Sequence, residues 1–272
     1  MALHRMSSGL VLTALIIVSI FLSPLHWVLY VLLIAAALIG TYEYAGLCKK
    51  KKIRLLLPLS LVFTTALLWD AGFYNLHHFT EILVVIISLT VLIFILSKNL
   101  QGVLIGSAAT IFGGLWIGLP MALGIIILKS EHGHFLLGFI MAVSFLTDTG
   151  AYVVGSNLGR RKLCPHLSPN KTVEGAWGGF FTAILTALVC QLILNLWNLA
   201  LFSLGEVIVL GAILGAISQL GDLVESAFKR DAGVKDSGNA LPGHGGILDV
   251  VDSFVFVLPL MYLYLEIFSP HI

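Results

Sequence analysis

The sequence contains little charge. Only 11% of its 272 residues are Asp, Glu, Lys or Arg, whereas 58% are hydrophobic. An ordinary soluble domain carries about 25% charged residues and needs a largely polar exterior. The composition therefore excludes an ordinary soluble fold and a disordered chain. The formal net charge is only +1, which excludes the basic surface of a nucleic-acid-binding protein. We predict an all-α polytopic integral membrane protein.

Several familiar short motifs are also missing. The cysteines, Cys48, Cys164 and Cys190, show no C-x-x-C spacing, which excludes a zinc site and a disulfide framework. There is no P-loop and no G-x-G-x-x-G fingerprint, so a P-loop ATPase and a Rossmann fold are excluded. No A-x-A-like cleavage site follows the first apolar run. We therefore expect that run to remain in the protein and not to be removed as a signal peptide.

Long apolar runs dominate the chain. A helix satisfies its own backbone hydrogen bonds in lipid, and about 20 apolar residues cross a bilayer. We predict a single membrane domain, residues 1–272, with nine spans: Gly9–Leu22, Trp27–Gly46, Leu55–Ala71, Ile82–Leu96, Gly102–Leu128, Phe135–Gly155, Gly175–Trp197, Gly205–Phe228 and Val250–Phe268. The first run is short and precedes Ser23-Pro24, which favours a re-entrant or half-span. The fifth contains Pro120, which predicts a kink or a break.

The basic residues indicate the orientation of the spans. If the N-terminus lies on the cytoplasmic side, every basic residue except Lys129 falls in an inside loop. The C-terminus would then lie outside. We expect the run Lys49–Lys52 to anchor this topology and to attract anionic lipid.

Polar residues divide the chain into two regions. Residues 1–140 contain few of them and predict a membrane scaffold. Glu43 and Asp70 lie near span ends there, where we expect them to snorkel or to hydrogen-bond locally. Residues 141–256 contain carboxylates within predicted spans. An aspartate at the centre of a span costs about 2.5–3.5 kcal/mol to insert, so such residues usually face a cavity and mark a functional path.

The carboxylates of the second region are spaced for a common site. Asp222 and Glu225 are three residues apart and share a helix face. Asp249 and Asp252 have the same spacing. An ion pair between Glu225 and Lys229 is the structural alternative, but it leaves the aspartates unexplained, since like charges repel unless a cation lies between them. Carboxylates with phosphate oxygens are the usual ligands of Mg²⁺. We predict a metal site formed by Asp148, Asp222, Glu225, Asp249 and Asp252.

Two inner loops have the composition of phosphate-binding segments. Residues 229–249 carry three cations and five glycines, and glycines let backbone amides approach an anion. The alternative, a flexible positive-inside loop, does not account for the Pro-Gly-His-Gly-Gly turn at 242–246. In the loop at 159–171 we expect Thr172 to cap the following helix. The N-terminus of that helix would favour a phosphate, helped by Lys171.

Four segments resemble the phosphatidate cytidylyltransferase (CDP-diacylglycerol synthase) family. The longest runs Ser226-Ala-Phe-Lys229-Arg230-x4-Lys235-Asp236-x-Gly238-x2-Leu241-Pro242-x-His244-Gly245-Gly246-Ile247-x-Asp249-x2-Asp252. The others are Asp148-x2-Ala151-Tyr152-x2-Gly155-x3-Gly159-Arg160 with Ser168-Pro169-x-Lys171-Thr172-x-Glu174-Gly175, and Gln219-Leu-Gly221-Asp222-Leu223-x-Glu225-Ser226. The resemblance covers about 148–252. Val250 and Asn170 depart from it, since the family usually has Arg and Lys there.

The resemblance implies an enzyme that converts CTP and phosphatidate into CDP-diacylglycerol and pyrophosphate with Mg²⁺ and a second cation. It implies membrane lipid as a partner and a homodimer; no nucleic acid is expected. A bacterial plasma membrane, with the active site facing the cytoplasm, is the expected location. The catalytic residues would be Asp222, Asp249 and Lys229. The substrate-binding residues would be Arg230, Lys235, His244, Gly245, Gly246, Ser168, Lys171 and Thr172.

Two other functions remain open from the sequence. A CTP-dependent polyprenol kinase-like lipid transferase would transfer the γ-phosphate instead. An ion-coupled transporter would also place carboxylates within spans, although it would normally show internal repeats, and none is visible in this sequence.

Overall fold

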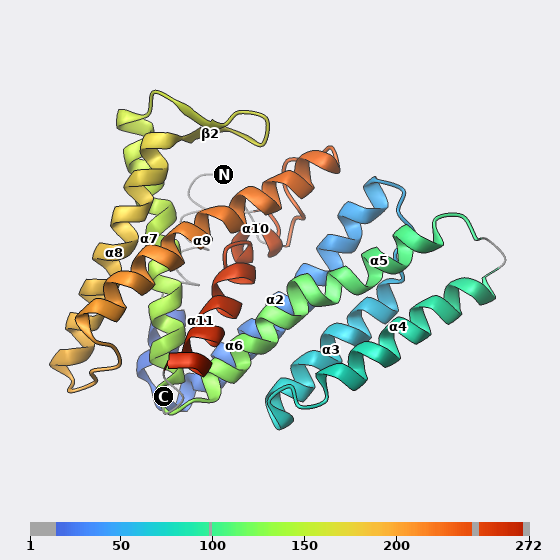
Figure 1. The fold of residues 1–272 in the computed structure, drawn as a ribbon, viewed down its shortest axis with the longest axis horizontal. Helices are drawn as coiled ribbons and strands as arrows, with labels where there is room; N and C mark the ends of the chain where they lie inside the picture. The colour runs from blue at the N-terminus through green and yellow to red at the C-terminus, as the bar shows by residue number, and fades with distance from the viewer. Residues whose placement is uncertain (1–14, 98–99, 241–244, 269–272) are drawn as a thin grey trace. The chain divides into compact units, whose positions relative to one another are not determined.

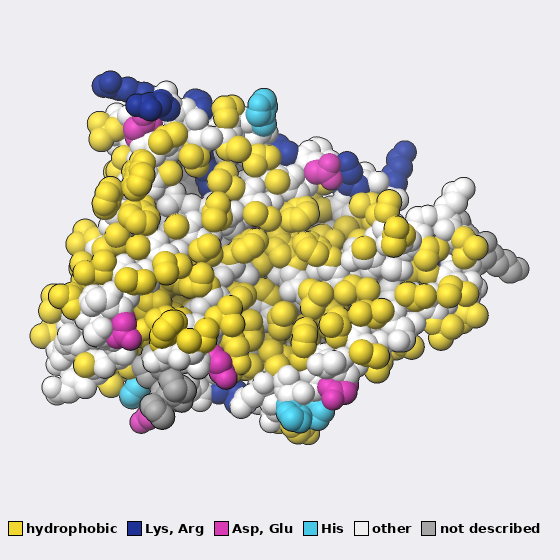
Figure 2. Space-filling model, viewed as in Figure 1, with side chains coloured by type: hydrophobic (Ala, Val, Ile, Leu, Met, Phe, Trp, Pro, Cys, Tyr) yellow, Lys and Arg dark blue, Asp and Glu magenta, His cyan; other side chains and the backbone are white. Residues whose placement is uncertain are grey.

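The structure is a computed structural model that describes residues 15–97, 100–240 and 245–268. Most of these residues are helical (Figure 1). Eight helices within the described ranges are long and apolar enough to cross a membrane. Hydrophobic side chains cover most of the face seen in Figure 2, and charged ones are few. The chain is therefore an all-α polytopic membrane protein.

Eight of the nine predicted spans correspond to helices within the described residues. The helices from α2 onward overlap the second to ninth predicted spans. The predicted span Gly9–Leu22 lies mainly outside the described residues, and a short 3-10 helix, η1 (Ser23–Leu25), follows it.

The chain forms two compact units, each described here by itself. Unit 1 comprises Met1–Lys129 and Phe228–Val251, and unit 2 comprises Ser130–Ala227 and Asp252–Ile272. The segment 228–251 falls in unit 1 with the N-terminal half. The division into a scaffold region, 1–140, and a motif region, 141–256, stays a prediction. That residues 1–272 act as one membrane domain stays a prediction.

Unit 1 contains the helices of the N-terminal half together with the segment 228–251. Its elements are α2 (His26–Lys50), α3 (Leu57–Tyr74), α4 (Phe79–Leu96), α5 (Val103–Gly113), η2 (Gly114–Gly118), α6 (Leu119–Lys129), the end of α9 and α10 (Leu248–Val251). A kink or a break was predicted at Pro120, and the π-helical turn η2 interrupts the α-helical pattern just before it, although Val103–Lys129 remains one helical span. Proline has no amide hydrogen, so an α-helical ladder cannot continue through it.

Unit 2 contains the helices on which most of the resemblance lies. Its elements are α7 (Gly133–Leu158), β1 (Lys162–Cys164), β2 (Ser168–Thr172), α8 (Val173–Leu196), most of α9 (Leu204–Asp231) and α11 (Phe254–Phe268). A side chain at Gly178 would collide with Val154, and one at Gly215 with Ala183. Glycines at these contacts let α8 approach α7 and α9 closely, as is common between helices in membranes.

Candidate functional site

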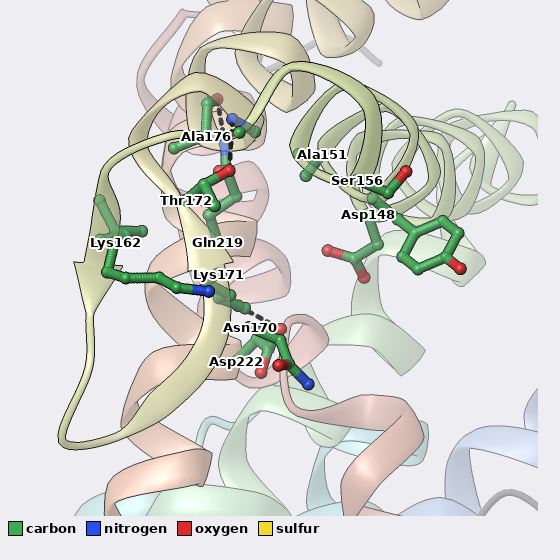
Figure 3. Close-up of a pocket in the computed structure, with 15 residues that line it drawn as sticks. Asp148, Ala151, Ser156, Lys162, Asn170, Lys171, Thr172, Ala176, Gln219 and Asp222 are labelled. Carbon is green, nitrogen blue, oxygen red and sulfur yellow. Dashed lines mark hydrogen bonds and ion pairs between the residues drawn. The ribbon is translucent and has the colours of Figure 1, made fainter.

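A pocket of about 530 Å³ lies in unit 2, where α7, the β1–β2 hairpin, α8 and α9 meet (Figure 3). Small-molecule sites commonly measure about 300–1,000 Å³. The polar side chains that line it are Asp148, Tyr152, Ser156, Lys162, Asn170, Lys171, Thr172, Gln219 and Asp222. We call it the aspartate pocket.

Negative charge is concentrated around the aspartate pocket. Lys171 forms an ion pair with Asp222, and both side chains are about a quarter exposed. The carboxylate of Asp148 lines the same pocket and interacts electrostatically with both of them (Figure 3). Asp252 is only 8% exposed and interacts electrostatically with Asp148 and Asp222. Three carboxylates therefore lie near one another at this end of unit 2.

The β1–β2 hairpin brings Lys171 to the pocket. We expected an open loop here, but β1 and β2 pair in antiparallel orientation. Glu174 fastens the base of the hairpin to the first turn of α8, because its Oε2 accepts hydrogen bonds from the backbone amides of Arg160 and Arg161 at 3.0 and 3.1 Å. The position of Lys171 is therefore set by the hairpin and by this link.

Thr172 caps α8, as predicted. Its Oγ1 accepts a hydrogen bond from the amide of Gly175 at 3.1 Å. A Cβ added at Gly155, Gly159 or Gly175 would lie 3.0, 2.7 or 3.0 Å from this oxygen. Three glycines of the resemblance thus let α7, the hairpin and α8 meet around one threonine. The N-terminus of α8 lies at the pocket wall, where helix amides favour an anion.

Asp252 is held beside α9 by close backbone packing. A Cβ at Gly221 would lie 2.7 Å from the carbonyl oxygen of Asp252 and 2.9 Å from the Cα of Ser253. Asp252 Oδ1 accepts hydrogen bonds from the amide and the hydroxyl of Ser253. Glycine at 221 therefore allows the segment at 252–253 to pack beside Asp222.

A second polar cluster lies in unit 1, within the glycine-rich segment 228–251. Lys229 Nζ donates to Asp249 Oδ1 at 2.6 Å, and the two side chains are only 13% and 10% exposed. Asp249 Oδ2 accepts from Ser237 N at 2.9 Å, Ser237 Oγ at 2.7 Å and Gly246 N at 2.7 Å. We call Lys229, Ser237, Gly246 and Asp249 the glycine-loop cluster. The predicted approach of glycine amides to an anion is present here, but the anion is a carboxylate of the protein.

Glu43 on α2 joins this cluster and was missed by sequence reasoning. Its side chain is buried, and it accepts hydrogen bonds from the amides of Ile247 and Leu248 at 3.1 and 2.8 Å. The expectation that Glu43 snorkels or bonds locally is wrong, because these partners are about 200 residues away. Asp70, in contrast, bonds locally to His78, as expected. A carboxylate within an apolar span was the signal that could have identified Glu43.

The remaining predicted site residues differ in burial and in secondary structure. Ser168 begins β2, and Glu225 is fully buried on α9. Arg230 and Lys235 are exposed, and the Arg230 guanidinium donates to the carbonyl of Val234. Gly245 has a φ of +93°, a conformation that favours glycine. His244 lies outside the described residues. The roles assigned to all these residues stay predictions.

The donor set of the aspartate pocket suits a hard divalent cation. Within the described ranges, no three His, Cys, Asp or Glu side chains converge closely enough to hold a metal ion by themselves. Mg²⁺ usually takes one or two carboxylates together with waters and substrate phosphates. Asp148, Asp222 and Asp252 supply carboxylates of this kind, so the pocket fits such an ion in its chemistry.

Comparisons with known proteins agree with the motifs. The model of the Cytidylyltransferase family matches residues 3–268. A phosphatidate cytidylyltransferase of Staphylococcus saprophyticus is 53% identical over 133 residues, which cover 49% of each chain. The phosphatidate cytidylyltransferase of Bacillus subtilis is 49% identical over 139 residues, which cover 51% of this chain and 50% of that protein. The chain thus spans about half the length of the curated relatives it matches.

Proposed function

Because this chain belongs to the cytidylyltransferase family, we propose that it transfers the cytidylyl group of CTP to phosphatidate. The products would be CDP-diacylglycerol and pyrophosphate. The observation that carries the proposal is the aspartate pocket, where the Asp148 and Asp222 carboxylates and Lys171 meet at the N-terminus of α8. Two relatives named phosphatidate cytidylyltransferase, each about half identical over the matched part, support the choice of substrates.

The pocket has the mixed lining that these substrates require. Phosphatidate brings acyl chains from the bilayer, and CTP brings a strongly anionic triphosphate from water. Ala151, Tyr152 and Leu163 supply apolar surface, whereas Lys171 and the amides at the start of α8 suit phosphate oxygens. An anionic lipid headgroup and a nucleotide phosphate could both be stabilised there.

The transfer itself requires little acid–base chemistry. A phosphate oxygen of phosphatidate attacks the α-phosphorus of CTP and forms a new P–O bond. The bond from the α-phosphorus to the bridging oxygen breaks, and pyrophosphate leaves with its electron pair. A phosphate monoester has a second pKa of about 6, so its oxygen is already ionised near pH 7 and needs no strong base. Positioning and charge stabilisation then account for most of the catalysis.

We assign the phosphate contacts as follows. Lys171, Thr172 and Ser168 would bind the lipid phosphate or the nucleotide. The remaining contacts would come from the glycine-rich segment: Lys229, Arg230, Lys235, His244, Gly245 and Gly246. Asp148, Asp222 and Asp252 would hold Mg²⁺. Asp249 and Glu225 stay predicted metal ligands; Asp249 is paired with Lys229, so it would bind a cation only after that ion pair opens. When bound, the ion supplies positive charge against the triphosphate.

We place the protein in a bacterial plasma membrane, with the N-terminus and the aspartate pocket on the cytoplasmic side. The distribution of Lys and Arg supports this orientation, since CTP is a cytoplasmic substrate and inside loops are basic. The bacterial relatives support the choice of membrane. A homodimer rests on the resemblance alone, and light scattering of the purified protein would test it.

The test is an assay of the purified protein with phosphatidate, Mg²⁺ and CTP labelled at either the α- or the γ-phosphate. Asp222→Asn serves as the blank. The proposal expects the α-label in a lipid and the γ-label in pyrophosphate. Transfer of the γ-label to a lipid alcohol would instead identify a kinase. If neither label moves in the unaltered protein, the proposal is wrong, and flux of ions across proteoliposomes would test the transporter alternative.

A further inference from the structure

We propose that Glu43, on helix α2 of the apolar N-terminal half, is a positioning residue for the reaction. It holds the glycine-rich segment in the conformation in which Asp249 and Lys229 are paired. The inference rests on the proposed function, because the reaction is the cytidylyl transfer proposed above. The contacts that support it all lie within unit 1.

The first observation is the set of donors around the Glu43 carboxylate. Oε1 accepts from the amide of Ile247, and Oε2 accepts from the amide of Leu248, where α10 begins. The Ser237 hydroxyl lies 3.3 Å from Oε2. Charge-assisted hydrogen bonds of this kind are about twice as strong as neutral ones. Glu43 therefore connects α2 to both ends of the loop between Ser237 and Leu248.

The second observation explains two glycines of the long motif. A Cβ at Gly238 or at Gly246 would collide with the carboxylate of Glu43. A larger residue at 238 would displace the Glu43 carboxylate from its hydrogen bonds, and one at 246 would displace the Ser237 hydroxyl as well. Helix α2 thus places a constraint on a motif that lies about 200 residues later in the sequence.

The third observation connects Glu43 to the predicted catalytic pair. Ser237 Oγ lies 2.7 Å from Asp249 Oδ2, and Asp249 Oδ1 accepts from Lys229. A serine hydroxyl has only one proton, so it donates to one carboxylate at a time. Ser237 therefore lies between Glu43 and Asp249, and a shift of the loop at Glu43 would displace the partners of Asp249. A displacement of about 1 Å can cost about 10²-fold in rate.

The first experiment replaces the carboxylate with an amide. Glu43→Gln keeps the shape of the side chain but replaces one acceptor oxygen with an NH2 group. That NH2 group would then face a backbone N–H, so two donors would meet. We expect kcat to fall by about 10²-fold while the KM for phosphatidate stays near the wild-type value, the pattern of lost alignment. Glu81→Gln makes the same change at an exposed glutamate in the first turn of α4 and should leave kcat unchanged.

The second experiment disturbs the same contact from the loop. Gly238→Ala places a methyl group against Glu43, and Gly72→Ala is its matched control, because a Cβ at Gly72 meets no atom within 4 Å. We expect Gly238→Ala to lower kcat as Glu43→Gln does. The double variant Glu43→Gln/Gly238→Ala should be no slower than the worse single variant, because both changes break one contact. Multiplicative losses would overturn the proposal.

Hydrogen exchange of the purified full-length protein supplies a readout that does not depend on turnover. In Glu43→Gln, the amides of Ile247 and Leu248 should exchange faster, while α2 to α6 keep their protection. Faster exchange throughout unit 1 would mean a general structural role and would overturn the proposal. Faster local exchange with unchanged kcat would also overturn it. If the wild-type protein transfers no cytidylyl group, the proposed function fails, and the exchange data still decide whether Glu43 holds the loop.

Discussion

The carboxylates of the two polar clusters have different partners. In the glycine-loop cluster, Asp249 accepts four hydrogen bonds, one of them from Lys229. In the aspartate pocket, Asp148, Asp222 and Asp252 interact with one another, and Lys171 pairs with Asp222. The carboxylate of the first cluster is satisfied by the protein. The three carboxylates of the second lie near one another, and in the proposed function a bound cation would lie among them.

The carboxylate of the glycine-loop cluster already has its partners within the protein, whereas the proposed function places a ligand against those of the aspartate pocket. Repulsion among carboxylates lowers the stability of the unliganded protein and is relieved when a cation binds. A carboxylate that already has a lysine and three further donors gains little from an added ion. Neutralising an aspartate should therefore have opposite effects on stability in the two clusters, and the predictions below test this contrast.

The largest effect is expected from Asp222→Asn in the aspartate pocket. Turnover should fall by about 10²–10³-fold, the scale for losing one preorganised electrostatic contact. Stability should change little, because a partly exposed ion pair such as Lys171–Asp222 is worth about 0–1 kcal/mol. Thermal unfolding with and without Mg²⁺ is the matching measurement. Mg²⁺ should raise the unfolding temperature of the wild type but not of the variant, and near-normal turnover would refute the assignment of Asp222.

The same substitution at two positions three residues apart, Asp249→Asn and Asp252→Asn, compares the clusters directly. The two variants should differ most in their unfolding temperature. Asp249→Asn leaves Lys229 buried without its carboxylate, which should cost about 3–5 kcal/mol of unfolding free energy. Asp252→Asn replaces a buried carboxyl group beside Asp148 and Asp222 with an amide of the same shape and should leave the unfolding temperature unchanged or raise it. Thermal unfolding in one detergent without divalent cations compares the two. Equal destabilisation by both substitutions would mean that the contrast is wrong.

The sequence predicts the helices of this fold because each span needs a long apolar run, and this rule is local. The interruption before Pro120 and the cap at Thr172 were predictable for the same reason, since both depend on neighbours within one turn. The β1–β2 hairpin was not predictable, because strands of three and five residues with little apolar alternation resemble a loop.

Glu43 shows where a local pattern fails. Its donors, Ser237, Ile247 and Leu248, are far away in the sequence, so no spacing rule connects them to α2. The sequence shows only that a carboxylate lies in an apolar helix, not which amides satisfy it. The same limit applies to Asp249, whose pairing with Lys229 across 20 residues requires the loop between them to fold first.

A smaller effect is expected from Thr172→Ala, which removes the cap of α8. The substitution should cost about 1 kcal/mol, the usual value for losing a threonine N-cap. It should also weaken phosphate binding, because the first turn of α8 forms part of the pocket wall. Thr149→Ala is a suitable control, since Thr149 is exposed within α7 and bonds only to the carbonyl of Phe145 among the contacts described. If both variants unfold at the same temperature, the cap contributes no measurable stability.

The smallest effect is expected from Val250→Arg, which restores a charge that this chain lacks relative to the family. Val250 is half-buried on α10, directly after Asp249. An added arginine there should lower the KM for CTP by about threefold to tenfold, since a partly exposed charge contact is worth about 1 kcal/mol. Val250→Gln adds length without charge and should not lower it. If both variants change the KM for CTP equally, the added charge is not the cause of the change. If Val250→Arg abolishes turnover while the protein stays folded, α10 holds its partners differently here, and the family's pattern cannot be carried over to this position.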